Sequence, residues 1–215
     1  MNKNKAIALI GSVFSVLVSV SWLWNARPAL AHHPSGGEIP NTFVTGFMSG
    51  LAHPVIGIDH LVFVIAIGLL AALNNKWGMI IPVAFVVATA VGTGIHLQSV
   101  DLPVPELIIA ASVLVMGIFL ARENQANAAL LTVVSAIAGI FHGYAYGEAI
   151  VGAETQALTA YLIGFCAIEL VISAIAFYSG KWALDRPNKS VILLRFAGFA
   201  VCGVGFAFLS QTILG

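Results

Sequence analysis

Along most of this chain, long apolar stretches alternate with short polar breaks. The apolar stretches are 42–73, 79–97, 106–121, 128–150, 158–178 and 191–214. Most of them have the roughly 20 residues that a helix needs to cross a bilayer core, and 106–121 reaches that length only with its flanking residues. The pattern predicts an all-α fold, a polytopic bundle of membrane helices.

The first apolar stretch is too long for one straight span, since 32 helical residues would reach about 48 Å. It contains the segment 53–60, which reads HPVIGIDH. Proline and glycine favour a break in a helix, so we expect a broken first span, with 42–52 as a half-helix entering from outside. Interrupted segments are tolerated where they line a cavity, and in transporters they point to the binding site.

Composition agrees with a lipid environment. Of the 215 residues, 60% are hydrophobic and 8% are charged, whereas soluble domains carry about 25% charged residues. The formal net charge is zero, which gives no reason to expect a nucleic-acid partner.

The N-terminus has the form of a cleavable signal peptide. Lys3 and Lys5 precede the apolar run 6–23, and Ala29-Leu30-Ala31 is a small-residue cleavage site. An uncleaved first helix is the alternative. Cleavage divides the chain into three parts: a signal peptide (1–31), a histidine-bearing outer segment (32–41) and a transmembrane helix bundle (42–215).

Lysine and arginine positions predict the orientation. If 42–73 crosses once, five basic residues fall on the inner side: Lys76, Arg122, Lys181, Arg186 and Lys189. The outer loops then hold Asp101, Glu106 and Glu154 and no basic residue, which is the positive-inside pattern. We predict six spans in the plasma (inner) membrane of a bacterium, with both mature ends outside.

All six histidines fall in the outer half of this topology: His32, His33, His53, His60, His96 and His142. Imidazole is the commonest metal-ligating side chain and suits nickel, cobalt, copper and zinc. On an unbroken helix His53 and His60 would differ by about 20° around the axis, so both could face one cavity. Asp59 is predicted to bind the metal or to orient His60. The alternative is a polar kink held by its own hydrogen bonds.

A second polar cluster, 141–148, reads FHGYAYGE. Three glycines at four-residue spacing let another helix approach closely: Gly139, Gly143 and Gly147. A packing seam alone is the alternative, yet His142 is not needed for packing and is a candidate ligand. Glu148 diverges from His142 by about 120° on a regular helix. The two share an ion only if the helix ends or bends near Gly147.

In these two segments the chain resembles the HupE/UreJ family, and the resemblance extends over nearly the whole mature chain. It implies a hydrogenase or urease accessory membrane protein, regarded as a nickel or cobalt permease. It also implies metal ligation by His53, Asp59, His60 and His142, with Glu148 as a further candidate. The sequence departs from the family at Tyr146, where a histidine is often found.

Four more residues have open interpretations. Cleavage after Ala31 would make His33 the second mature residue, and an amine, an amide and this imidazole suit planar nickel(II) or copper(II) coordination. The alternative is a leader in which His32 and His33 only attract metal. Glu169 is expected to be a proton-coupling carboxylate or a neutral packing residue, and His96 a ligand or a helix-end residue.

The leading hypothesis is a secondary permease, not an enzyme, that imports Ni²⁺ or Co²⁺ and holds no prosthetic group. No Walker sequence is present. Its predicted partners are the divalent metal ion and the lipid bilayer, and self-association or a link to metalloenzyme maturation stays open. A zinc-dependent intramembrane hydrolase and a metal-binding sensor or assembly factor are the alternatives. Because 61–73 is wholly apolar, a polar route inward must come from other helices.

Overall fold

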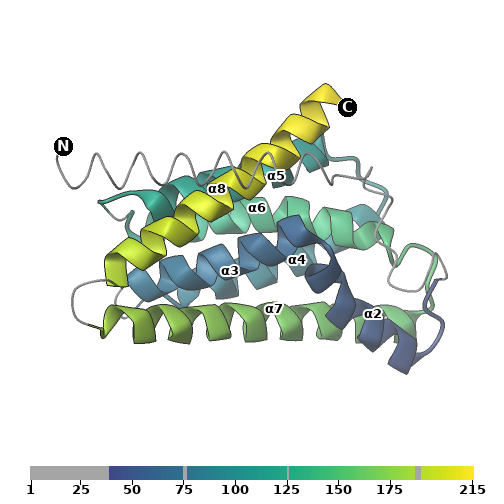
Figure 1. Ribbon diagram of the computed structural model, residues 1–215. Coiled ribbons are helices and arrows are strands. Elements are labelled where there is room, and N and C mark those ends of the chain that lie inside the picture. Colours follow the sequence, from purple (N-terminus) through teal and green to yellow (C-terminus); the bar gives the residue numbers. More distant parts are fainter. Residues whose placement is uncertain (1–38, 75–76, 125, 187–189) are drawn as a thin grey trace.

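The structure is a computed structural model that describes residues 39–74, 77–124, 126–186 and 190–215. All regular elements in these ranges are α-helices: α2 (Phe43–Ile56), α3 (Ile58–Leu73), α4 (Ile80–Leu97), α5 (Pro105–Ala121), α6 (Ala128–Glu148), α7 (Thr155–Leu184) and α8 (Ser190–Leu214). Most run side by side along one direction, and α8 crosses obliquely (Figure 1). The all-α prediction is confirmed. The predicted signal peptide, His32 and His33 lie outside the described residues.

Most of these helices are long and apolar enough to cross a membrane. Within the described residues α4, α6, α7 and α8 qualify singly, and the bent pair of α2 and α3 makes a fifth crossing if it counts as one span. Helix α5 has 17 residues, which corresponds to about 26 Å, so it is a shorter apolar helix. Four crossings are therefore supported, or five with the bent pair as one span, and the sixth, by α5, stays a prediction.

The first apolar stretch is broken, as its sequence predicts. Helices α2 and α3 meet at an angle of 79°, and Gly57 between them has extended backbone angles. Pro54 lies inside α2 and does not end it. The amide of Gly57 still donates to the carbonyl of His53 over 3.1 Å, so the last turn of α2 closes before the chain changes direction.

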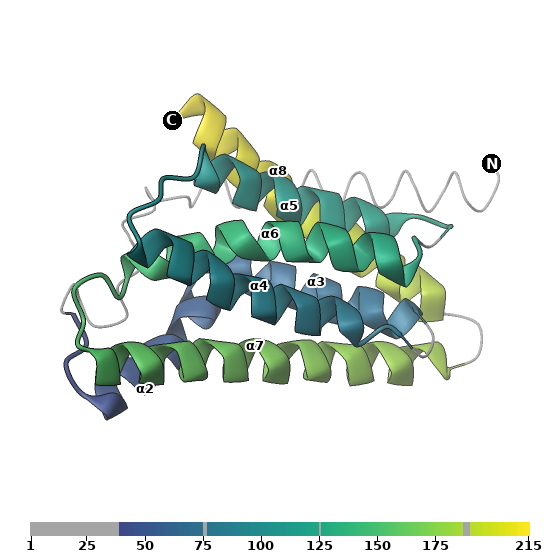
Figure 2. The ribbon, with the colours of Figure 1, turned by 180° about the vertical axis from the view of Figure 1, so that it is seen from behind.

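Close helix pairs hold the bundle together. Helix α4 packs along α6, α5 along α8, and α2 along the first half of α7 (Figure 2). The α4–α6 contact is tightest where Gly143 faces Thr89, because a Cβ at position 143 would overlap the Thr89 backbone. Such contacts between small residues allow backbones to approach closely where lipid gives helices no hydrophobic reason to associate.

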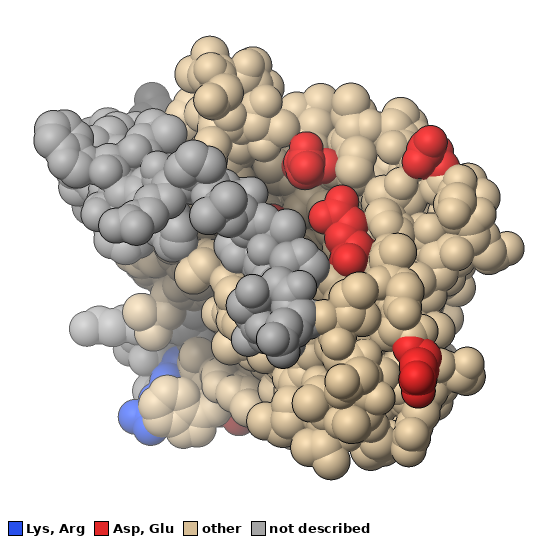
Figure 3. Space-filling model, turned by 90° about the vertical axis from the view of Figure 1, so that its right-hand side faces the viewer, with Lys and Arg blue, Asp and Glu red and all other residues tan. Residues whose placement is uncertain are grey.

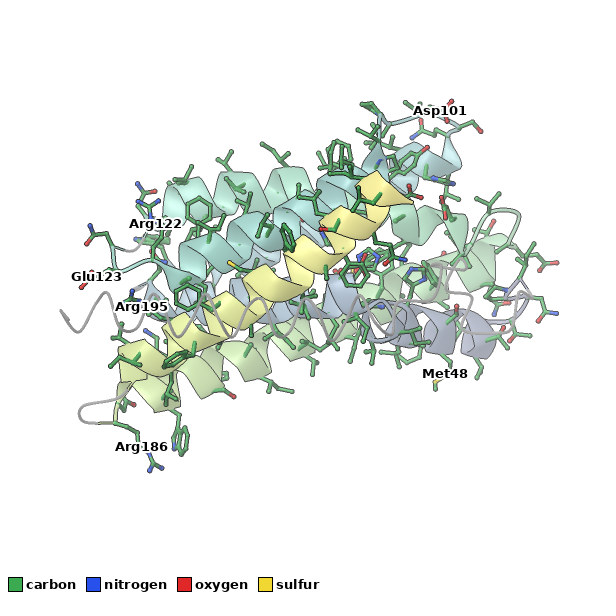
Figure 4. All side chains as sticks on the ribbon, turned by 45° about the horizontal axis from the view of Figure 1, so that its top comes forward. Met48, Asp101, Arg122, Glu123, Arg186 and Arg195 are labelled. Atoms are coloured by element: carbon green, nitrogen blue, oxygen red, sulfur yellow. The ribbon has the colours of Figure 1, made fainter. Side chains whose placement is uncertain are left out.

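The two ends of the bundle differ in charge. We call the end with the 98–104 loop and the 149–154 connection the acidic end, and Figure 3 shows its surface with carboxylates. The opposite, basic end holds Arg122, Arg186 and Arg195 together with Glu123, while Asp101 lies at the acidic end (Figure 4). The predicted grouping of basic residues at one end is thus confirmed for the described residues; Lys76 and Lys189 lie outside them.

Candidate metal centre

Two histidines that are 82 residues apart in the sequence meet inside the bundle near its acidic end. The Nδ1 atoms of His60, in the first turn of α3, and His142, on α6, are 2.7 Å apart. Both side chains are buried, with exposed fractions of 5% and 0%. The structure therefore brings the two sequence motifs into direct contact.

The neighbours of His142 determine which nitrogen carries its proton. The Ser112 hydroxyl on α5 donates to the Ile109 carbonyl over 2.7 Å, so its only hydrogen is used. Its oxygen therefore accepts from Nε2 of His142, 3.0 Å away. For neutral rings, Nδ1 of His142 then accepts from Nδ1 of His60. This leaves Nε2 of His60 with the lone pair that can ligate a metal.

The same reasoning applies to His53, near the end of α2. The Tyr161 hydroxyl on α7 donates to the Tyr146 carbonyl over 2.9 Å, so its oxygen accepts from Nδ1 of His53, 3.1 Å away. In the neutral ring, Nε2 of His53 carries the lone pair. Both His53 and His60 thus have an Nε2 atom suited to a metal, and both rings are oriented through Nδ1, as ligating histidines usually are.

The spacing of these two rings suits a shared ion. The His53 and His60 ring centroids are 6.0 Å apart. Two imidazoles on one ion have centroids about 5–6.5 Å apart, because each metal–nitrogen bond is about 2.1 Å long. The break at Gly57 makes this approach possible: a Cβ at position 57 would lie 2.5 Å from Cδ2 of His60. The rings meet across a break, not along the unbroken helix from which a shared cavity was expected.

Asp59 lies beside this pair on the side toward the acidic end. Its Oδ1 accepts from the His60 amide over 2.9 Å, which occupies one of the free N–H groups of the first turn of α3. The same oxygen is 4.0 Å from Nε2 of His60, and the Asp59 side chain is 22% exposed. A partly exposed carboxylate therefore lies directly beside His60.

Aromatic rings enclose the centre. The Tyr146 ring lies against both histidines, with centroids 4.8 Å from His53 and 4.6 Å from His60. Toward the basic end, Phe63 and Phe85 contact the His142 ring at 4.5 and 5.4 Å. Both phenylalanines are fully buried, so apolar packing closes the centre on that side.

The other predicted ligands are not gathered here. Glu148 is the last residue of α6 and is exposed. His96, half-buried on α4, makes an edge-to-face contact with the Tyr144 ring, with centroids 4.4 Å apart. Among the described residues, no three His, Cys, Asp or Glu side chains form a group that could hold a metal ion. His142 in this conformation holds His60, and a ligand role for His142 would require that hydrogen bond to open.

Sequence reasoning missed Ser112 and Tyr161, the residues that orient the histidines. Both are polar residues in otherwise apolar stretches, a signal that marks functional positions in membrane helices. That signal is weak for serine and tyrosine, which are common in such helices. Their partners lie 30 and 108 residues away in the sequence, so only the folded structure identifies them.

A model of the HupE/UreJ protein family matches residues 20–208, most of the chain. The chain belongs to the HupE/UreJ family. It is also 30% identical over 185 residues to Protein HupE of Rhizobium leguminosarum bv. viciae, an alignment that covers 86% of this chain and 92% of that protein. No solved structure matches.

Family membership and the apolar helices together describe a multi-pass membrane protein. Members of this family are accessory or transport proteins rather than catalysts, which agrees with a role other than catalysis. The two motifs that carry the resemblance in the sequence, at 53–60 and 141–148, are the segments that the fold places around one buried centre.

Proposed function

We propose that this protein is a permease that carries Ni²⁺ or Co²⁺ across the membrane. One observation carries the proposal: two buried imidazoles, His53 and His60, meet across a helix break at a spacing suited to one ion. Imidazole nitrogens suit copper and zinc as well as nickel and cobalt. The family resemblance favours nickel and cobalt.

The proposed route begins at the acidic end. We place this end outside the cell, because the basic residues gather at the other end, as the positive-inside rule requires of inner loops. Asp59, partly exposed, attracts the cation, and His53 and His60 bind it after it loses water. Inward movement of a divalent ion gains about 4.6 kcal/mol per 100 mV of membrane potential.

Four further assignments belong to the same proposal. Six spans place both mature ends outside, with α5 as the sixth crossing. His32 and His33 capture metal at the outer surface, and Glu148, exposed where α6 ends, contributes there and not in the buried centre. His142 supports His60 and ligates only if their mutual hydrogen bond opens.

The test is uptake of radioactive nickel and cobalt by cells that produce the protein. His60→Ala is compared with wild type at equal membrane abundance, and His96→Ala is the matched control, since His96 lies outside the centre. We expect uptake of one metal by wild type and by His96→Ala, and background uptake by His60→Ala. Wild-type cells that take up neither metal, or a His60→Ala variant that transports normally, would refute the permease proposal.

A further inference from the structure

Glu169 is a carboxylate that the centre described above does not use. It is the fifteenth residue of the 30-residue helix α7 and has an exposed fraction of 0%. No other aspartate or glutamate among the described residues is buried. Tyr161, which orients His53, lies eight residues earlier on the same helix, so Glu169 is about 12 Å deeper in the bundle.

The hydrogen bonding of Glu169 is incomplete. Its Oε2 faces the Thr89 hydroxyl of α4 at 3.0 Å, but that hydroxyl also lies 2.8 Å from the Val86 carbonyl and has one hydrogen for both. Its Oε1 has no hydrogen-bond partner among the described residues. A buried polar atom without a partner costs about 1–3 kcal/mol, so such a group usually has a functional reason.

Tyr146 lies between Glu169 and the histidine pair. Its ring contacts His53 and His60, and its hydroxyl faces the Glu169 carboxylate without a well-formed hydrogen bond to it. That hydroxyl also has no hydrogen-bond partner among the described residues. Two incompletely bonded polar groups, one on α6 and one on α7, thus lie side by side directly beyond the histidines.

An ion that leaves Asp59 for the interior needs a deeper negative charge. Neutral imidazoles leave the ion with its full double charge, and an unpaired charge in a low-dielectric interior is strongly unfavourable. The apolar 61–73 segment offers no such group. Glu169 supplies one, and the polar groups beside it are the hydroxyls of Thr89 on α4 and Tyr146 on α6.

We propose that Glu169 is a second, deeper cation station, which a divalent metal reaches from His53 and His60 when the Tyr146 side chain swings aside. This proposal rests on the proposed permease function and adds the step that follows metal binding at His53 and His60. Glu169 ligates the ion through its carboxylate, and Tyr146 separates the two stations while the ion is held at the histidines.

The test combines metal binding and uptake in the full-length protein. Glu169→Gln keeps the shape of the side chain and removes the charge, and Glu154→Gln is the matched control, because Glu154 is exposed at the start of α7. Nickel and cobalt binding to purified protein is measured by calorimetry, and uptake in cells. We expect Glu169→Gln to bind metal at the histidines with near wild-type affinity and to lose uptake by about tenfold or more.

Glu169→Asp is used if Glu169→Gln does not accumulate in the membrane. Aspartate keeps the negative charge but is one methylene shorter than glutamate, so we expect metal uptake to fall by several-fold while metal binding at the histidines is unchanged. Normal uptake in whichever variant accumulates would overturn the deeper station. Loss of binding together with uptake would also overturn it, because Glu169 would then belong to the histidine centre.

The two proposals fail in different ways. If wild-type protein takes up no metal, the permease function itself is wrong. If the wild-type protein and Glu169→Gln both take up metal while His60→Ala does not, only the deeper station is wrong.

Discussion

The halves of the bundle toward its acidic and basic ends are built on different principles. Toward the acidic end, the helix is broken at Gly57 and buried polar groups bond to one another across helices, as in the contact of His60 with His142. Toward the basic end, α3 is regular and its apolar side chains pack against α5, α6, α7 and α8, as Ile67 and Met116 do in one continuous core. The same helices α3 and α6 take part in both halves.

The difference shows how one helix bundle binds ions in one half and prevents their leakage in the other. Side chains that hold an ion need fixed hydrogen-bond partners, and Ser112 and Tyr161 supply them from neighbouring helices. Side chains that keep ions from leaking need only close packing. We therefore expect substitutions in the acidic half to change metal handling more than stability, and substitutions in the basic half to do the reverse.

The largest expected effect on stability tests the α4–α6 contact that joins the halves. Gly143→Ala places a methyl group against the Thr89 backbone, which cannot yield without separating the helices. We expect a loss of about 3 kcal/mol, the upper part of the range for overpacking. Thermal unfolding in detergent measures it. Gly94→Ala on α4 is the matched control, because nothing lies within 4 Å of its added Cβ; equal loss in both variants would contradict the tight seam.

A smaller loss is expected from a cavity in the basic half. Ile67 is fully buried, and Ile67→Ala removes packing contacts. Because lipid is as apolar as the helix interface, the cost comes mainly from the cavity, about 2 kcal/mol. Thermal unfolding and metal binding are measured together, and we expect binding to stay unchanged. A variant that keeps its stability but loses metal affinity would contradict the division between the halves.

The smallest effect on stability should accompany a clear effect on metal binding. Tyr161→Phe removes the hydroxyl that fixes His53 and should cost about 1 kcal/mol of stability. Metal affinity should fall about tenfold, as when other partners of ligating histidines are removed. Calorimetric titration with nickel and cobalt measures the change. Tyr178→Phe, exposed at the far part of α7, is the matched control, and unchanged affinity in Tyr161→Phe would show that His53 needs no such partner.

The sequence by itself determined the helices and the position of the break. A long apolar segment in lipid is stable only as a helix, because its backbone N–H and C=O groups must form hydrogen bonds within the segment. Gly57 acts on neighbouring residues, so the change of direction between α2 and α3 is a local property. The histidines at 53, 60 and 142 were visible for the same reason: they are costly residues in apolar stretches.

Only the tertiary structure decided which groups meet. The sequence spacing of His53 and His60 suggested one face of an unbroken helix, but the rings approach across a break of 79°. Glu169 could be noted as unusual, yet its place beside Thr89 and Tyr146 depends on the packing of α4, α6 and α7. Side chains 80 residues apart carry no local signal of their pairing. The physical reason is that backbone bonding in lipid fixes each helix locally, whereas helix pairing depends on contacts between distant small and polar residues.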